Sequence, residues 1–377
     1  MKVAIFSEYY HPHLGGLEMR AKGIAEELVR AGHSVAVFTV GYEEDLPERE
    51  IVNGVVVHRH HAWHYGRPGV KFVRRGLRAM LSYALWCRSQ ARGDFDLLFY
   101  TEFPVVHAVM APALARRKAI MDWCEFRRDN VFKTIQKWAP KLFRWNTCVA
   151  EEVGKGMQNS SGRNFYCLPS GINVDHFRSE EQDRQHLIYI GRLQPHKNLP
   201  FLISCFEEFC SRGHRDKLYL IGGGAEEASL RERCKESPWR DLIVMTGTIT
   251  DQEKIAFLSK AKAMVLVSMR EGFPVSIAEA LASGLPTVTI DLPENGASSV
   301  VRQYRCGLVA EPNPVAVADA LEAVLAERRM YSTACLEAAR GLDWSFVVRS
   351  LLNYLAGTSE VFAAAALNEE PVKQMGP

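Results

Sequence analysis

The stretch Glu271-Gly-Phe-Pro-Val-Ser-Ile-Ala-Glu279-Ala-Leu-Ala-Ser-Gly284-Leu-Pro286 determines how the rest of the chain is interpreted. The apolar run at 263–267 is typical of a buried strand, and residues 275–282 are good helix formers that end at a Ser-Gly pair. A second apolar run, rich in β-branched residues, follows at 285–290. A strand, a loop, a helix and a strand in this order form the unit of a parallel α/β sheet, which we therefore expect here.

Two carboxylates, Glu271 and Glu279, flank the loop that this unit predicts at the carboxyl end of a strand. Open α/β sheets bind their ligands at such loops. A helix that begins at Pro274 or Val275 would direct free N–H groups toward the loop, where a phosphate is favoured. Two acceptor groups beside an anion site suit a sugar-nucleotide, which has hydroxyls at both ends and phosphates between them.

The spacing of the two glutamates resembles the E-x7-E motif of retaining GT-B glycosyltransferases of the GT4 family, together with Gly272-Phe273-Pro274 and the Ala-Ser-Gly-Leu-Pro ending. The resemblance implies that Glu271 faces the transferred sugar and that Glu279 takes the ribose hydroxyls. It also implies that the loop formed by Phe273, Pro274 and Val275 binds sugar and phosphate oxygens.

A second candidate phosphate site lies at Gly191-Arg192-Leu193-Gln-Pro-His-Lys197-Asn198, between a predicted strand at 187–190 and a helix from Leu199. Arginine offers a fork to two oxygens and lysine a point charge. The stretch is similar to the G-R-L-x-x-x-K motif of GT4. This similarity implies that Arg192 and Lys197 hold the donor diphosphate and neutralise it as it leaves.

Glycine-containing turns supply the remaining candidate donor contacts. Gly15 and Gly16 precede a predicted helix at 17–30 and resemble the GT4 loop that approaches the donor diphosphate, where a Cβ would block the backbone. The turns at Gly223 and at Gly247-Thr248 resemble family turns near the nucleotide. The first crossover lacks G-x-G-x-x-G, which disfavours a dehydrogenase-type fold.

Three acidic residues are candidates for acceptor binding. Glu102 follows a predicted strand at 97–100, while Asp122 and Glu125 fall in a predicted loop after a strand at 119–121. Many GT4 members place a histidine in this second loop, and this chain has none there. Asp122 or Glu125 could hold a sugar hydroxyl or an amine, and either could equally cap a helix.

Composition indicates an ordinary globular protein of more than one domain. The chain has 377 residues, 47% hydrophobic, and a net charge of +2, which shows no strong bias toward nucleic acid. The nine cysteines form no C-x-x-C pair and predict reduced, buried thiols in a cytoplasmic protein. The sequence shows no signal peptide and no apolar run that could span a bilayer.

Basic residues are concentrated in the first half, where residues 67–163 hold 18 Lys or Arg and 8 Asp or Glu. Two segments, 70–92 and 131–144, have the pattern of basic amphipathic helices. Such helices can lie on an anionic membrane, which would make the protein peripheral at the inner face, or they can be ordinary solvated surface helices. Both interpretations stay open, and nucleic-acid binding is disfavoured because no recognised motif accompanies the charge.

The prediction is an α/β protein of GT-B fold, with two Rossmann-like domains facing across a cleft and a C-terminal helix that crosses back to the first domain. The expected parts are an acceptor-side domain at 1–170, a nucleotide-sugar domain at 171–344, the returning helix at 345–357 and a tail at 358–377. A Pro-Ser-Gly-Ile-Asn-Val-Asp-His-Phe run at 169–177 resembles the family linker.

The predicted activity is retaining transfer of a hexosyl group from a UDP- or GDP-linked sugar to a hydroxyl of a glycan, a lipid-linked acceptor or a small aglycone. We expect no cofactor and no metal, because no Asp-x-Asp motif is found where one is needed and the Arg192/Lys197 pair can replace the cation. The alternatives are a nucleotide-sugar epimerase, a phosphorylase, and a non-catalytic nucleotide-sugar-binding protein.

Overall fold

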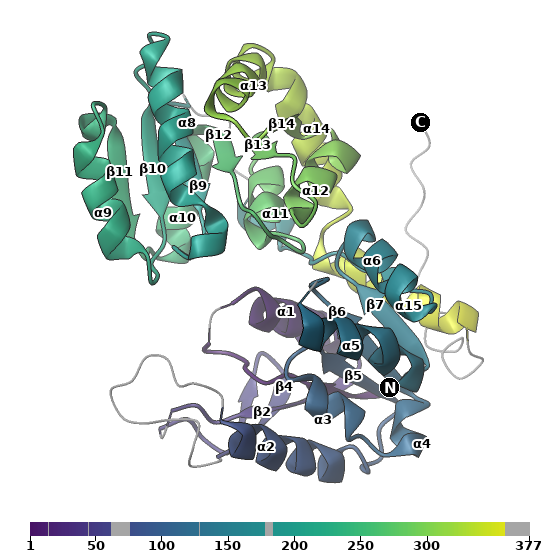
Figure 1. Cartoon of the computed structure of the whole chain (residues 1–377). Coiled ribbons are helices and arrows are strands. Elements are labelled where there is room, and N and C mark those ends of the chain that lie inside the picture. The colour runs from purple at the N-terminus through teal and green to yellow at the C-terminus, as the bar shows by residue number, and fades with distance from the viewer. Residues whose placement is uncertain (14, 44, 62–75, 128, 178–183, 359–377) are drawn as a thin grey trace. The chain divides into compact units, whose positions relative to one another are not determined.

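In a computed structural model of the chain, residues 1–377 are described with the exception of 14, 44, 62–75, 128, 178–183 and 359–377 (Figure 1). The chain divides into two compact units. One unit is Met1–Pro169 together with the segment from Trp344, and the other is Ser170–Asp343. Each unit is built on one α/β sheet.

The first unit contains an eight-stranded sheet of order β3-β4-β2-β1-β5-β6-β7-β8 among the described residues. All pairs are parallel except β3–β4. Strands β5, β6 and β7 are buried at every residue, so both faces of the sheet are covered. The strands are β1 (Lys2–Phe6), β2 (Ser34–Val40), β3 (Arg49–Val52), β4 (Val55–His60), β5 (Leu97–Thr101), β6 (Ala119–Trp123), β7 (Trp145–Cys148) and β8 (Tyr166–Cys167).

The helices of the first unit include one that comes from the far end of the sequence. Helix α15 follows the second unit in the chain, yet Val347, Leu351 and Leu355 pack in the same core as β1 and α1. The predicted returning helix is thus confirmed. The helices are α1 (Gly16–Arg30), α2 (Leu77–Gln90), α3 (Val105–Val109), α4 (Ala113–Arg116), α5 (Asn130–Trp138), η1 (Ala139–Leu142), α6 (Glu151–Ser161) and α15 (Trp344–Thr358).

The described residues of the second unit form a six-stranded parallel sheet of order β11-β10-β9-β12-β13-β14. Its strands are β9 (His186–Ile190), β10 (Lys217–Ile221), β11 (Ile243–Gly247), β12 (Ala261–Leu266), β13 (Thr287–Ile290) and β14 (Gly307–Ala310). Its helices are α7 (Val174–Phe177), η2 (Pro195–Lys197), α8 (Leu199–Ser211), α9 (Glu227–Glu236), η3 (Arg240–Leu242), α10 (Asp251–Lys260), α11 (Val275–Ala282), α12 (Gly296–Tyr304), α13 (Pro314–Ala326) and α14 (Arg328–Arg340).

Each sheet has a point at which the strand order reverses. In the first unit β1 lies between β2 and β5, and in the second unit β9 lies between β10 and β12. The loops that leave two such neighbouring strands run in opposite directions, so a crevice for a ligand is expected between them. The loops after β9 and β12 contain Arg192, Lys197 and Glu271, the residues that the sequence marks for the donor.

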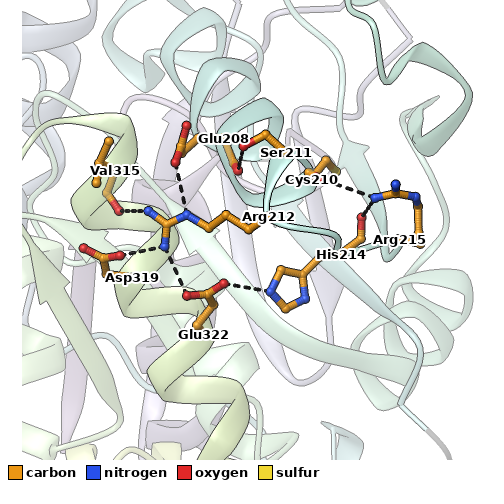
Figure 2. Close-up of polar contacts among 9 residues, drawn as sticks. All are labelled: Glu208, Cys210, Ser211, Arg212, His214, Arg215, Val315, Asp319 and Glu322. Atoms are coloured by element: carbon orange, nitrogen blue, oxygen red, sulfur yellow. Dashed lines mark hydrogen bonds and ion pairs between the residues drawn. The ribbon is translucent and has the colours of Figure 1, made fainter.

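An ion-pair network joins α8 to α13 in the second unit (Figure 2). Arg212 donates to Asp319 at 2.6 Å, to Glu208 and Glu322 at 3.1 Å each, and to the Val315 carbonyl at 3.3 Å. His214 contacts the other Glu322 oxygen at 2.9 Å. Because the network lies at the turn that follows α8, it fixes the end of the helix whose first residue follows the candidate phosphate loop.

Some predicted elements are wrong in detail. The helix predicted at 131–144 ends at Trp138 and continues as η1, because Pro140 lacks the N–H that a further helical turn needs. Near the end of the second unit, Tyr304 ends α12, and the left-handed Arg305 (φ 50°) stops that helix before β14. Of the helix predicted at 70–92, residues 70–75 lie outside the described residues, and α2 begins at Leu77.

Candidate functional site

Lys197 and Glu271 meet at the reversal point of the second sheet. The Lys197 Nζ atom makes an ion pair and hydrogen bond with the Glu271 carboxylate, and the two side chains are 13% and 10% exposed. Lys197 ends the η2 turn after β9, whereas Glu271 lies in the loop after β12. The structure therefore brings together two residues that are 74 positions apart in the sequence.

The backbone around Glu271 is fixed on both sides. Its N–H donates to the Glu294 carbonyl at 2.9 Å, and its own carbonyl accepts from the Gly296 N–H at 2.9 Å. A Cβ on Gly296 would lie 2.0 Å from the Gly272 carbonyl oxygen, so only glycine permits this approach. The loop after β13 thus holds the Glu271 loop in place through main-chain contacts.

Arg192 lies at the same edge of the second sheet as Lys197, but the surroundings of its side chain differ. Its side chain is exposed, and it makes no ion pair with another described residue. Its carbonyl accepts a hydrogen bond from the Tyr189 hydroxyl at 3.1 Å, which ties the loop to the end of β9. A cation held on a fixed backbone without a protein counter-ion is available to an anionic ligand.

The glycine turns after β10 and β11 interlock with the Arg192 loop. The Gly191 N–H donates to the Ile221 carbonyl, and the Leu193 N–H donates to the Gly223 carbonyl at 3.0 Å. The Gly222 N–H donates to the Gly247 carbonyl at 2.9 Å. Gly222 has φ 136°, and a Cβ there would lie 2.0 Å from the Gly191 oxygen. Thr248 Oγ1 lies 3.0 Å from the position of a Cβ on Gly223. Gly223, Gly247 and Thr248 are therefore neighbours of the Arg192 loop.

Glu279 lies on α11, whose first turn faces the same edge. Pro274 precedes this helix, and its carbonyl accepts from the Ile277 N–H at 3.0 Å. Because proline offers no side-chain oxygen as a cap, the N–H groups of Val275 and Ser276 are available to another acceptor. Phe273 is half-buried against the core, and Val275 begins the helix. Glu279 is 7% exposed, which excludes a simple solvated carboxylate.

Lys254 is the partner of Glu279, and the sequence did not single it out as a site residue. Its Nζ lies 2.6 Å from Glu279 Oε1, across α10 and α11. Burial raises the pKa of Glu279, and the positive charge of Lys254 opposes that rise. No sequence motif marks this pair, because the two residues are 25 positions apart and belong to different helices.

In the first unit, Gly15 and Gly16 begin α1 at the carboxyl end of β1. Gly15 is in an extended conformation (φ −166°) and provides no capping side chain. Glu18 Oε2 lies 2.2 Å from the position of a Cβ on Gly15, while no atom of the described residues lies within 4 Å of a Cβ on Gly16. Because neither glycine has a side chain, neither of them covers the backbone N–H groups at the start of α1.

Glu102 is completely buried at the end of the neighbouring strand β5. Its Oε2 accepts from the N–H groups of Cys124 at 2.8 Å and Glu125 at 3.0 Å. Its Oε1 has no hydrogen-bond partner among the described residues. Burial, reinforced by the charge of Glu125, raises the pKa of Glu102 to about 8. Glu102 thus fixes the loop that carries Glu125.

The predicted loop position of Asp122 is wrong. Asp122 lies inside β6, is 0% exposed, and accepts from Arg20 at 2.7 and 2.9 Å and from Thr147 at 2.6 Å. Arg20 also donates to the Leu168 carbonyl at 2.8 Å. A buried arginine needs a carboxylate partner, and this pair joins α1 to the sheet.

The described residues contain no group of three or more His, Cys, Asp or Glu side chains that could hold a metal ion. Within the same residues, no helix has both the length and the apolar character that a membrane crossing requires. Neither observation bears on the parts of the chain outside the described ranges.

Comparison with known proteins matches both halves of the chain. The model of the Glycosyl transferases group 1 family matches residues 172–341, and that of the Glycosyl transferase 4-like domain matches residues 15–147. The phosphatidyl-myo-inositol mannosyltransferase of Mycobacterium leprae is 24% identical, over 93% of this chain and 96% of that protein. A GDP-mannose-dependent alpha-mannosyltransferase of Mycobacterium tuberculosis is 24% identical, over 94% and 96%.

Among solved structures, Anabaena HepE in complex with UDP-glucose superimposes with a TM-score of 0.74 at 16% identity, over 95% of this chain and 100% of that chain. The fold and the family matches together define a GT-B glycosyltransferase that takes its sugar from a nucleotide-sugar donor. The chain belongs to the GT4 family, a retaining family of hexosyltransferases.

Proposed function

We propose that the carboxyl edge of the second sheet is the donor site, and that the protein transfers a hexosyl group there from a UDP- or GDP-linked sugar to an acceptor hydroxyl. The observation that carries this proposal is the meeting of Lys197 and Glu271 at the sheet reversal, with Arg192 exposed beside them. In this assignment Arg192 and Lys197 bind the diphosphate, Glu271 faces the sugar and Glu279 accepts the ribose hydroxyls.

The proposed chemistry follows from charge separation. As the bond between the anomeric carbon and the phosphate oxygen breaks, the sugar becomes oxocarbenium-like and the diphosphate gains negative charge. Arg192, Lys197 and the first turn of α11 would stabilise the leaving group, and one such contact is worth about 3 kcal/mol. Glu271 would orient the sugar and oppose its positive charge. In this proposal the two cations serve in place of a divalent metal.

The donor base is open between uracil and guanine. One relative is GDP-mannose-dependent by name, whereas HepE was solved with UDP-glucose. Thermal-shift binding of UDP, GDP and their common sugar conjugates to wild type and to an Arg192→Ala/Lys197→Ala variant tests the proposal. A shift for one base series that the double variant loses supports the donor site, and no shift with any of them contradicts it.

For the acceptor, we propose a glycan, a lipid-linked acceptor or a small aglycone, bound on the side of Glu102 and Glu125. The surface of α2 favours an acceptor at a membrane. Leu77, Leu81 and Leu85 form one row along this helix and are 68%, 40% and 56% exposed. Arg78 is exposed beside the row, and an apolar row next to cationic side chains fits an anionic lipid surface.

Flotation with vesicles that contain anionic phospholipid tests this membrane contact. We expect wild type to float and a Leu81→Glu/Leu85→Glu variant to remain in solution, while both melt at the same temperature. Leu114→Glu is the control. Leu114 is exposed but lies on α4 and not on α2, so this variant should float like wild type. Equal flotation of wild type and the α2 variant would contradict the contact.

A further inference from the structure

The contact between Lys254 and Glu279 has a geometry that suits a supporting role in the donor site. Lys254 Nζ lies 2.6 Å from Glu279 Oε1 and 3.2 Å from Asp251 Oδ1. It also lies 5.4 Å from the centroid of the Phe177 ring. The side chains of Lys254 and Glu279 are 18% and 9% exposed, so solvent screens the interaction only weakly.

The position of Lys254 is fixed by its own helix. Thr250 and Glu253 form a capping box at the start of α10, in which the Glu253 N–H donates to Thr250 Oγ1 at 3.3 Å and the Thr250 N–H donates to Glu253 Oε2 at 2.8 Å. The Lys254 N–H donates to the Thr250 carbonyl at 2.9 Å. The first turn of α10 thus has a defined start from which Lys254 extends to α11.

Glu279 needs such a partner if it is to bind hydroxyl groups. A carboxylate accepts several hydrogen bonds only when it is ionised, and burial disfavours that form. Charged or titratable groups that act on Glu279 are Lys254 and Asp251 from α10 and His176 from α7. Among the described residues, only the Lys254 side chain hydrogen-bonds the Glu279 carboxylate, so one oxygen is occupied and the other is left for a ligand.

We propose that Lys254 is a positioning residue of the donor site, which holds the Glu279 carboxylate with one oxygen on the lysine and the other directed to the ribose hydroxyls of the donor. The proposal rests on the proposed function, in which Glu279 takes the ribose. Lys254 itself need not touch the nucleotide. Its loss should therefore remove recognition of the ribose hydroxyls while leaving the rest of the nucleotide site intact.

The test is the ratio of dissociation constants for ribo- and deoxyribonucleotides, measured by calorimetry. The probes are UDP and GDP with their 2′-deoxy and 3′-deoxy forms. A hydrogen bond to a charged group is worth about 1.5–3 kcal/mol, so wild type should bind the better ribonucleotide about 10-fold or more tightly than one of its deoxy forms. In Lys254→Met the same ratio should fall to below about 3-fold.

Two further variants separate positioning from a general loss of structure. Lys254→Arg keeps a cation that can reach Glu279 and should restore most of the ratio, even if Lys254→Met folds poorly. Lys260→Met removes an exposed positive charge from the same helix and should behave as wild type. The melting temperature without ligand reports whether each variant is folded.

Each outcome supports or overturns the inference. A wild-type ratio in Lys254→Met, or equal weakening of the ribo and deoxy forms, overturns the positioning role. If Glu279→Gln also leaves the ratio at its wild-type value, the assignment of the ribose to Glu279 fails as well. If neither diphosphate binds wild type, the proposed donor site fails, and the inference fails with it. A fall in the ratio in both Glu279→Gln and Lys254→Met supports the two proposals together.

Discussion

At the scale of single residues, the charged side chains of the candidate donor site form ion pairs with one another. Lys197 and Glu271 form an ion pair with little exposure to solvent, and Lys254 and Glu279 form another. A donor diphosphate that binds Lys197 must therefore compete with Glu271. This competition makes the two members of the pair separable by experiment, because they act on different parts of the donor.

We predict that Glu271→Gln lowers kcat by about 100-fold or more, since it removes a charge that opposes the oxocarbenium-like sugar. The same substitution should leave the affinity for the nucleoside diphosphate alone unchanged or make it tighter, because the competitor for Lys197 is gone. Steady-state kinetics and calorimetry measure the two effects. Glu236→Gln on the exposed face of α9 is the control, and weaker diphosphate binding by Glu271→Gln would contradict the account.

Glu102 should make stability depend on pH. Its carboxyl has an ordinary pKa of 4.5 when the chain is unfolded and a pKa of about 8 in the folded protein, because it is buried near Glu125. Between these values the folded state holds a proton that the unfolded state has released, so stability falls as pH rises through this window. Glutamine keeps an oxygen for the two backbone N–H groups and has no proton to lose.

Glu102→Gln should therefore match wild type at pH 5 and exceed it in melting temperature at pH 8. The difference in unfolding free energy at pH 8 should be above about 1 kcal/mol. Thermal melts from pH 5 to 9 measure this, and Glu311→Gln at an exposed site should show no such trend. A Glu102→Gln curve parallel to that of wild type would rule out a buried, protonated carboxyl.

At the scale of elements, the sequence predicts best where local signals agree. Helix α11 has the bounds that the sequence predicts, 275–282, because Pro274 marks its start and the Ser283-Gly284 pair marks its end. The prediction of Asp122 in a loop was wrong because the predicted strand ended at Met121, whereas Asp122 and Trp123 are buried in β6. Its partner Arg20 lies 102 positions away, and no local pattern reveals a buried ion pair.

The same limit applies to the candidate site. Motif resemblance predicted that Lys197 and Glu271 serve one donor, but their direct contact depends on β9 and β12 being neighbours. Lys254 was not predicted at all, since its contact with Glu279 arises from the packing of α10 against α11. Local sequence patterns do not give the order of the strands in the sheet, and this order brings loops that are distant in the sequence to one edge of the sheet.

Because the glycine turns lie close against the Arg192 loop, we expect a single added methyl group to lower the stability of the protein. A Cβ on Gly222 would lie 2.0 Å from the Gly191 oxygen, and φ there is 136°, so Gly222→Ala must displace the Arg192 loop. We expect a loss of more than about 2 kcal/mol of unfolding free energy, measured by denaturant titration. No atom of the described part of the chain lies within 4 Å of a Cβ on Gly76, where φ is −71°, so Gly76→Ala should cost less than about 0.5 kcal/mol.

At the scale of the whole molecule, the GT-B class and the return of the C-terminal helix follow from the resemblance of the chain's motifs to those of the GT4 family. The close contact that seats this helix does not. Gly23 on α1 lies against Trp344, and a Cβ there would come within 2.0 Å of the indole ring. Helix α15 therefore depends on a residue at the opposite end of the chain.

Gly23→Ala should lower the free energy of unfolding by about 1–3 kcal/mol, because the added methyl group overpacks the contact with Trp344. A smaller side chain at 344 should remove part of this cost. The Gly23→Ala/Trp344→Leu variant should accordingly be less destabilised than the sum of its single variants. Additive effects in this double-mutant cycle, followed by chemical denaturation, would show that the two positions do not contact each other.

The central claim is that the carboxyl edge of the second sheet binds the donor. A crystal structure of the protein with UDP or GDP, whichever raises the melting temperature, tests this claim most directly. The account predicts phosphate oxygens within hydrogen-bond distance of Arg192 and Lys197, and a ribose hydroxyl on Glu279, with the Lys197–Glu271 contact broken. A nucleotide bound away from this edge, or one that leaves Lys197 on Glu271 and Glu279 without a ligand, would contradict it.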